Sequence, residues 1–278
     1  MHRFILTLAC PDRMGIVAAV ASHLLEHRCN IVESAQFGDA ATQQFFMRVC
    51  FDAAEPDVQR TFTSVGEQFA MQWAIHDTAI KPRALLMVSK FGHCLNDLLY
   101  RYRVGALRMD IPAIVSNHRD FYRLAADHDI PFHHLPVTAD TKSKQEQRLL
   151  SIVEEERCDL VVLARYMQIL SPQACEALQG RAINIHHSFL PSFQGAKPYQ
   201  QAHERGVKLI GATAHYVTKE LDEGPIIEQD VARVDHAMSV EHCAAAGRDV
   251  ECAVLARAVQ WQVEHRILLN GRRTVIFK

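Results

Sequence analysis

Apolar and polar residues along the first part of the chain follow two different periods. Single-residue alternation, as in Phe4, Leu6 and Leu8, predicts half-buried strands, and apolar residues three and four positions apart predict amphipathic helices. The order is strand, helix, strand, strand, helix, strand within about eighty residues, which is typical of a ferredoxin-like βαββαβ domain. The expected strands lie at 3–9, from 29–32 onward, at 45–51 and at 73–75, and the helices follow Gly15 and Pro56.

The pattern changes after Lys81-Pro82-Arg83, where a proline between two cations suits a linker. The runs Ala84–Val88 and Leu160–Ala164 are apolar throughout, as expected for parallel strands buried on both faces. Strands and helices then alternate, so we expect an α/β domain with a doubly wound, mostly parallel, Rossmann-like sheet. A β-hairpin with its turn at Asn270-Gly271 is expected at the end. The predicted domains are 1–81 and 84–278.

Composition places the chain among globular proteins. It has 278 residues, of which 49% are hydrophobic and 22% are charged. Thirty basic against 32 acidic residues give a net charge of −2, so there is no basic excess for a nucleic-acid partner. None of the eight cysteines forms a C-x-x-C pair, and we expect them to be reduced. The sequence begins directly with a strand pattern and has no run of membrane-spanning length, which predicts a cytoplasmic protein with no membrane partner.

Candidate chemistry gathers where the strand expected at 181–185 ends. In open parallel sheets, ligands bind at the carboxyl ends of the strands, and Asn184 and His186 lie at such an end. The two side chains lean to the same side of the strand, where an amide N–H and an imidazole could stabilise an oxyanion. Asp222, 36 residues after His186, could orient the imidazole and move protons. Taken alone, the Asn-x-His pattern fits an ordinary hydrogen-bonded histidine better.

A longer stretch around these residues resembles the catalytic domain of the folate-dependent formyltransferases. The similar segments are Leu163–Pro172, Asn184–Pro191, His215–Val217 and Leu221–Ile227. The resemblance implies that Asn184, His186 and Asp222 form the catalytic trio and that the substrate is a 10-formyl folate. It also implies a substrate pocket in which a loop holds the pterin, and the binding residues would be Tyr166, Met167, Gln168, Ile169, Leu170, His187 and Val217.

The first eighty or so residues resemble an ACT domain, a small amino-acid-sensing module, through Pro11–Gly15, the apolar helix that follows and Asn30-Ile31. By that resemblance Asp12, Gly15 and Asn30 would bind an amino-acid effector, and a homo-oligomer is expected because such modules commonly pair. Gly15 has no side chain, which would let a ligand approach the backbone closely. The alternative is that Gly15 only begins a helix, that Asn30 only caps a turn and that the module only dimerises.

The residues around the trio also bear on the formyl acceptor. Ser89–Asn96 has one glycine and a bulky Phe91, unlike the glycine- and serine-rich phosphate loop of glycinamide-ribotide formyltransferases. The basic C-terminal domain of transfer-RNA formyltransferases is also not apparent. An ACT module joined to this catalytic domain resembles instead the folate deformylases, a family in which water is the acceptor. The resemblance implies a hydrolase that releases formate and tetrahydrofolate from 10-formyltetrahydrofolate, with no metal and no permanently bound cofactor. Such an enzyme balances the one-carbon folate pool and supplies formate for purine synthesis.

Several alternatives stay open on the sequence alone. The chain could be a formyltransferase with an unidentified amine acceptor, or a non-catalytic amino-acid sensor built on an inactive enzyme domain. His133 and His134 with His128 could bind a metal, although no cysteine or aspartate pattern accompanies them. Lys197 could place a positive charge near the transferase acceptor site, or could be solvated surface.

Overall fold

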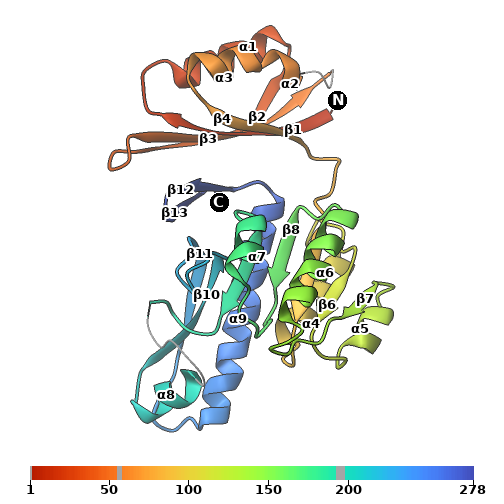
Figure 1. Cartoon of the computed structure of the whole chain (residues 1–278). Helices are drawn as coiled ribbons and strands as arrows, with labels where there is room; N and C mark the ends of the chain where they lie inside the picture. Colours follow the sequence, from red (N-terminus) through yellow and green to blue (C-terminus); the bar gives the residue numbers. More distant parts are fainter. Residues whose placement is uncertain (1, 55–57, 192–197) are drawn as a thin grey trace. The chain divides into compact units, whose positions relative to one another are not determined.

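The computed structural model of the chain describes residues 2–54, 58–191 and 198–278. The chain divides into two compact units (Figure 1): an N-terminal unit that reaches Lys81 and also contains Glu264–Lys278, and a second unit, Pro82–Val263. The chain therefore passes between the units twice. The sequence pattern assigned 264–278 to the second domain; the structure differs because this segment packs on the N-terminal sheet. None of the helices in the described ranges is both long and apolar enough to cross a bilayer.

The N-terminal unit is a four-stranded antiparallel sheet with strand order β2-β3-β1-β4 and helices on one face (Figure 1). The predicted βαββαβ fold is confirmed. The helical stretch expected after Pro56 is two short helices, and Pro56 itself lies outside the described residues. The elements are β1 (His2–Pro11), α1 (Ile16–Glu26), β2 (Asn30–Asp39), β3 (Gln44–Ala53), α2 (Val58–Thr61), α3 (Thr63–Gln68) and β4 (Gln72–Asp77).

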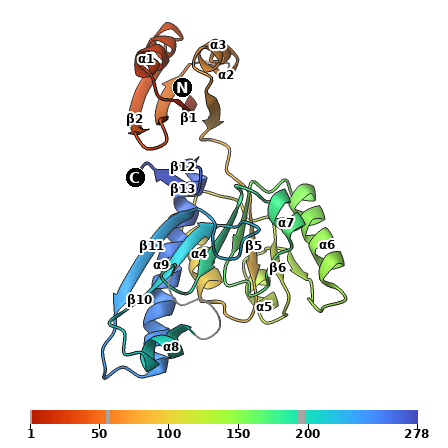
Figure 2. The same ribbon diagram turned by 60° about the vertical axis from the view of Figure 1, so that its left-hand side comes forward.

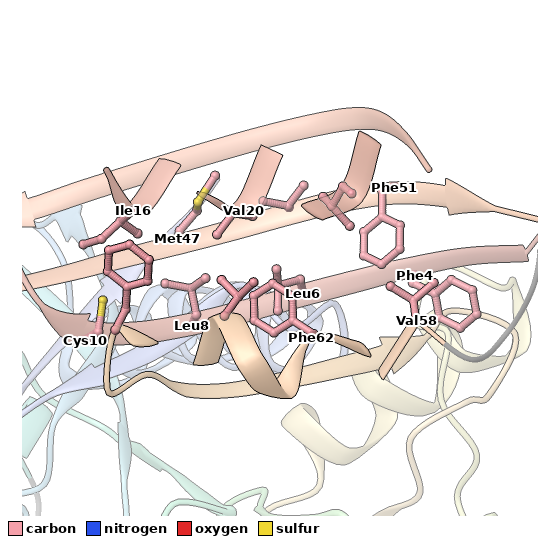
Figure 3. Packing of buried hydrophobic residues seen from close by; sticks show 14 of the residues in the cluster. Phe4, Leu6, Leu8, Cys10, Ile16, Val20, Met47, Phe51, Val58 and Phe62 are labelled. Atoms are coloured by element: carbon pink, nitrogen blue, oxygen red, sulfur yellow. The ribbon is translucent and has the colours of Figure 1, made fainter. Parts of the chain in front are cut away.

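The core of this unit lies between the sheet and its helices (Figure 3). Alternation along β1 directs Phe4, Leu6 and Leu8 to the helix side, where at most 5% of each is exposed. Phe51 from β3 and Phe62, which follows α2, complete this layer and are fully buried. Burial of each such side chain stabilises the fold by roughly 1.5–3 kcal/mol.

The C-terminal hairpin, β12 (Ile267–Asn270) and β13 (Arg273–Ile276), covers the opposite face of the same sheet. Phe45 and Met47 belong to the helix-side core, so Phe46 between them points to the other side, where it packs with Leu268 and Phe277. The hairpin thus buries apolar surface that four strands and three helices would leave in water.

Arg48 on β3 anchors the start of this segment. Its side chain is only 3% exposed and donates to the carbonyl oxygens of Glu264 and His265 at 3.1 and 3.2 Å. It also forms an ion pair with Glu33 at 3.0 Å. A buried cation that loses its partners costs several kcal/mol. The stability of the sheet therefore depends on the carbonyl groups of residues 264–265, which accept from Arg48.

The stability of the N-terminal unit should depend on pH through His265. Its ring stacks on His76 with centroids 3.6 Å apart. Burial, and then the positive charges of His76 and Arg48, lower the pKa of His265 from 6.5 to about 4. Between these values the unfolded chain binds a proton that the folded chain does not, so stability should fall as pH drops through this window.

Replacing His265 by Phe keeps an aromatic ring against His76. The urea concentration at the midpoint of unfolding, measured by circular dichroism, should then change less between pH 6.5 and 4 than in the wild type. The matched control is His236→Phe at an exposed histidine of the second unit. An unchanged slope in His265→Phe would show that this ring does not carry the effect.

The second unit is built on a seven-stranded sheet with order β11-β10-β9-β8-β5-β6-β7. Five strands are parallel and the two at one edge are antiparallel, as the prediction of a mostly parallel sheet required. Helices α6 and α7 cover one face, and α4 and α9 pack together on the other (Figure 2). The elements are β5 (Ala84–Val88), α4 (His93–Arg103), β6 (Ile114–Ser116), α5 (Tyr122–Ala126), β7 (Phe132–His134), α6 (Lys142–Glu155), β8 (Leu160–Leu163), α7 (Pro172–Ala177), β9 (Ala182–His186), α8 (Pro198–Glu204), β10 (Leu209–Tyr216), β11 (Ile226–Arg233) and α9 (Val240–Val263).

The direction of strand order reverses at β5, which lies between β8 and β6. Crevices form at such switch points, at the carboxyl ends of the strands. Ser89 follows β5, and its N–H donates to the carbonyl oxygen of Arg165 after β8 at 3.2 Å. The N–H of Met167 donates to the Ser89 hydroxyl at 3.0 Å. These bonds fix the loop after β8 over the end of β5.

Candidate functional site

A cavity of about 590 Å³ opens in the second unit beside the carboxyl ends of β5, β8 and β9. Its lining contains Asn184, His186 and Asp222, and also every residue that the sequence predicted for folate binding. These residues come from the end of β9, the loop after β8 and the segment after β10. The fold thus gathers three segments that are far apart in the sequence.

His186 and Asp222 form the centre of the site. Nδ1 of His186 lies 3.2 Å from Oδ2 of Asp222, and the side chains are 7% and 14% exposed. The other ring nitrogen, Nε2, is buried and has no hydrogen-bond partner within the described ranges. A buried polar nitrogen without a partner costs about 1–3 kcal/mol, so Nε2 is set to bond a ligand in the cavity. Because Nδ1 faces the Asp222 carboxylate and carries the proton there, Nε2 is a hydrogen-bond donor only in the imidazolium form of the ring.

His215 on β10 joins this pair and was not among the residues predicted from the sequence. Its Nδ1 donates to the carbonyl oxygen of Tyr216 at 2.9 Å. Its Nε2 lies 3.2 Å from Nδ2 of Asn184 and 3.6 Å from Oδ1 of Asp222. A neutral His215 therefore accepts from the Asn184 amide and orients it, whereas a protonated one donates towards Asp222. The antiparallel register of β9 and β10 sets Asn184 opposite His215.

Asp222 is held as a carboxylate. Burial by itself would raise its pKa, but the contacts with His186 and His215 outweigh it and hold the pKa well below the ordinary 3.8. The backbone of Asp222 has φ of +58°, in the left-handed region that side chains larger than glycine rarely adopt. Such strain costs of order 1–3 kcal/mol and is typical of functional sites.

Gly224 allows the segment 222–224 to lie against the backbone of β10. A Cβ atom there would sit 1.7 Å from the carbonyl oxygen of Tyr216, which is backbone that cannot swing away. We expect Gly224→Ala to destabilise the protein by about 1–3 kcal/mol, the usual cost of overpacking. A thermal melt measures this, with Gly206→Asn as control because Gly206 faces open space and asparagine tolerates its φ of +63°. Equal melting temperatures for Gly224→Ala and the control would contradict the close approach.

The loop after β8 supplies the apolar part of the lining. Met167 and Ile169 line the cavity and are 49% and 61% exposed. Tyr166 and Leu170 are buried beneath them, and the Tyr166 hydroxyl accepts a hydrogen bond from Gln145 at 3.1 Å. Burial raises the pKa of Tyr166 to about 12, so it stays neutral. An exposed apolar loop on a fixed base suits a flat, largely apolar ligand.

The lining also contains a charged cluster that the sequence did not reveal. Glu251 on α9 is fully buried and pairs with His93 at 2.7 Å and with Arg165 at 3.2 Å. The Tyr199 hydroxyl donates to the same carboxylate. We call these four residues the Glu251 cluster. Glu251 falls on the apolar stripe of α9, beside Val254 and Leu255, and a carboxylate in that position was the one sequence signal for the cluster.

Metal-ligating side chains come together once within the described ranges, where ligand atoms of His93, Cys94 and Glu251 lie within 4.8 Å of one another. The guanidinium of Arg165 beside Glu251 opposes a further cation there. The metal site considered at His128, His133 and His134 forms no such group in the described part of the chain. Lys197 lies outside the described residues.

The residues predicted to bind an effector do not meet within one chain. Gly15, with φ of +94°, and Asp12 lie before α1, whereas Asn30 begins β2 beyond the other end of that helix. Eleven helical residues span about 16 Å. The sheet register agrees, because Asn30 pairs with Asp52 at one end of β3 and Pro11 pairs with Gln44 at the other.

Comparison with known proteins covers both units. Residues 82–259 match the formyl transferase family and residues 2–74 match the ACT domain. Formyltetrahydrofolate deformylase of Corynebacterium sp. (strain P-1) is 49% identical, covering 99% of this chain and 98% of its own. The crystal structure of formyltetrahydrofolate deformylase from Burkholderia mallei ATCC 23344 is 57% identical with a TM-score of 0.97, covering both chains fully. Glycinamide ribonucleotide transformylase 1 from Symbiobacterium toebii is 28% identical with a TM-score of 0.67, covering 73% of this chain and 97% of its own.

Proposed function

The chain belongs to the formyltetrahydrofolate deformylase family, and we propose from this that its cavity hydrolyses 10-formyltetrahydrofolate to formate and tetrahydrofolate. The geometric observation that carries the proposal is Nε2 of His186. This nitrogen is buried in the cavity wall without a partner in the described ranges, while Nδ1 of the same ring lies 3.2 Å from the Asp222 carboxylate. This arrangement offers a hydrogen-bond donor to a carbonyl oxygen and a carboxylate to a nucleophile. Formate released in this way is available for purine synthesis, and turnover adjusts the one-carbon folate pool.

We assign the steps as follows. The Asp222 carboxylate accepts a hydrogen bond from a water molecule and directs its oxygen at the formyl carbon. As the C–O bond forms, the amide of Asn184 and the imidazolium form of His186 stabilise the oxyanion, with Nδ1–H of His186 on Asp222 and Nε2–H on the oxyanion. The bond from the formyl carbon to N10 then breaks, N10 takes the proton given up by water through Asp222, and formic acid loses its remaining proton to solvent.

The folate would lie against the loop after β8. Met167 and Ile169 present exposed apolar surface for the pterin ring, with Tyr166 and Leu170 as its base. Gln168 supplies an amide for the polar edge of the ring, and Val217 lines the pocket from the segment after β10. No permanently bound cofactor enters these steps.

A formyltransferase with an amine acceptor is the less favoured alternative. The transformylase structure covers 73% of this chain, whereas the deformylases cover nearly all of it, ACT domain included. A non-catalytic sensor would have no need of the strained, ionised Asp222.

For the N-terminal unit we propose a regulatory and assembly role. Strand β2 is at the edge of its sheet and exposes Val32 and Phe37 by 48% and 47%, so a second copy can pair along it. Because Asp12 and Gly15 lie far from Asn30 within one chain, an amino-acid effector that touches all three must bind between copies. A cytoplasmic location is the prediction made from the sequence. Turnover measured with a panel of free amino acids tests the regulatory role, and no response to any of them would contradict it.

The proposed hydrolysis is tested by incubating the protein with 10-formyltetrahydrofolate and no amine. We expect formate and tetrahydrofolate to appear in equal amounts over many turnovers. Formation of product only after an amine is added would overturn the hydrolase and favour the transferase.

A further inference from the structure

Glu251 takes no part in the steps above, yet its burial is expensive. A buried carboxylate costs several kcal/mol unless it is paired and hydrogen-bonded. Here His93 and Arg165 lie within 2.7 and 3.2 Å, and Tyr199 donates to the second oxygen. Burial alone would raise the pKa of Glu251, but these three contacts lower it, so the group is ionised beside the charge of Arg165.

Two backbone features keep the Glu251 cluster in place. Gly247 precedes Glu251 by one turn of α9, and a Cβ atom at Gly247 would lie 2.2 Å from the ring of Tyr199. Glycine inside a helix costs about 1 kcal/mol relative to alanine, and here it makes room for that ring. Arg165 adopts φ of +65°, again in the left-handed region. The chain thus accepts a weaker helix position at Gly247 and a strained backbone at Arg165 to bring these side chains to the cavity.

His187 links the cluster to the catalytic residues. Its ring meets His186 edge-on at 5.1 Å and Tyr199 at 6.4 Å between centroids. Burial, and then the charges of Arg165 and His186, lower the pKa of His187 to about 4, so this ring is neutral at physiological pH. A continuous series of contacts therefore runs from Asp222 through His186, His187 and Tyr199 to Glu251.

The chemistry of the catalytic trio does not by itself choose between water and an amine. In either case the nucleophile bonds to the formyl carbon, the bond to N10 breaks, and one proton passes from the nucleophile to N10. The donors on the oxyanion serve both reactions equally. With the folate placed against the loop after β8 as proposed above, the part of the lining left for the nucleophile is the side of His187 and Tyr199. Selection of the acceptor must come from the space on that side.

We propose that Tyr199, His187 and Arg165, held by Glu251, form a wall that leaves room for water and excludes amines. This inference rests on the proposed hydrolysis and names its specificity-determining residues. Glu251 acts as a positioning residue, because it reaches the reacting atoms only through Tyr199 and Arg165.

Tyr199→Ala tests the wall directly, with Tyr199→Phe as the matched control that keeps the ring. Each protein is incubated with 10-formyltetrahydrofolate and methoxyamine, a small amine that is unprotonated at neutral pH, and N-methoxyformamide and formate are quantified by mass spectrometry. We expect the ratio of formylated amine to formate to rise at least about tenfold in Tyr199→Ala. Discrimination between substrates that differ by one small group in a pocket is typically about 10- to 200-fold, and tenfold is the lower end of that range. Tyr199→Phe keeps the ring but loses the hydrogen bond to Glu251, so its ratio should lie between those of the wild type and Tyr199→Ala.

Gly247→Ala provides a second variant, since its methyl group displaces the Tyr199 ring while favouring the helix. It should raise the same ratio. An unchanged ratio in whichever of the two variants folds would overturn the wall, even if overall activity drops, because a merely structural defect slows both reactions alike. Failure of the wild type to release formate without an amine would instead overturn the hydrolase proposal itself.

Discussion

Replacing Asp222 by Asn is expected to lower formate release from 10-formyltetrahydrofolate by about 10³-fold or more. The amide has the same shape but carries no charge, so it neither directs a water proton nor holds His186 in the orientation that points Nε2 into the cavity. The residue also sits 3.2 Å from His186 and 3.6 Å from His215, so both lose their anionic partner.

The control for this variant is Asp249→Asn, at an exposed aspartate of α9. Steady-state rates and thermal melts of both variants separate catalysis from folding. Asp222→Asn should remain folded, because the substitution is isosteric. A loss smaller than tenfold in the folded variant would mean that another group directs the water.

Replacing His186 by Gln should cost about 10²–10³-fold, and the loss should fall on kcat rather than on KM. Nε2 of His186 has no hydrogen-bond partner in the described ranges, and the oxyanion to which it would donate develops only in the transition state. Glutamine reaches a different position and does not bond to Asp222 in the same way.

His236→Gln, at an exposed histidine, is the matched control for His186→Gln. If KM rises while kcat stays constant, His186 binds the folate in its ground state and does not stabilise the oxyanion.

Much of the fold follows from local pattern. Alternation in β1 and β3 and the uniform apolar runs of β5 and β8 were sufficient to predict a ferredoxin-like unit and a mostly parallel sheet. No apolar periodicity predicts helix α7, although Ser171-Pro172 carries its start signal: the serine hydroxyl accepts from the N–H of Ala174 at 3.2 Å. Short helices offer too few turns for periodicity to reveal them.

Contacts between distant segments were harder to foresee. The turn at Asn270-Gly271 predicted the C-terminal hairpin, but nothing local shows that it packs on Phe46, more than two hundred positions earlier. Asn184 and His186 could be placed at a strand end by pattern. Asp222 was a candidate from its carboxylate alone, but only the resemblance to a family implied that it joins them. His215 depends on the register between β9 and β10, which the sequence does not display.

The Glu251 cluster combines both difficulties. Its members come from α4, the loop after β8, α8 and α9, and each has an ordinary role when considered alone. Only their contacts with one buried carboxylate relate them to one another, and such contacts are a property of the three-dimensional fold.

The central claim is that water is the formyl acceptor in the Asn184–His186–Asp222 cavity, and oxygen-18 labelling tests it most directly. The protein is incubated with 10-formyltetrahydrofolate in oxygen-18 water without any amine, and the formate is analysed by mass spectrometry. The expected result is catalytic formate release with one heavy oxygen per formate, abolished in Asp222→Asn. Formate that carries no label, or that forms only when an amine is supplied, would contradict the mechanism.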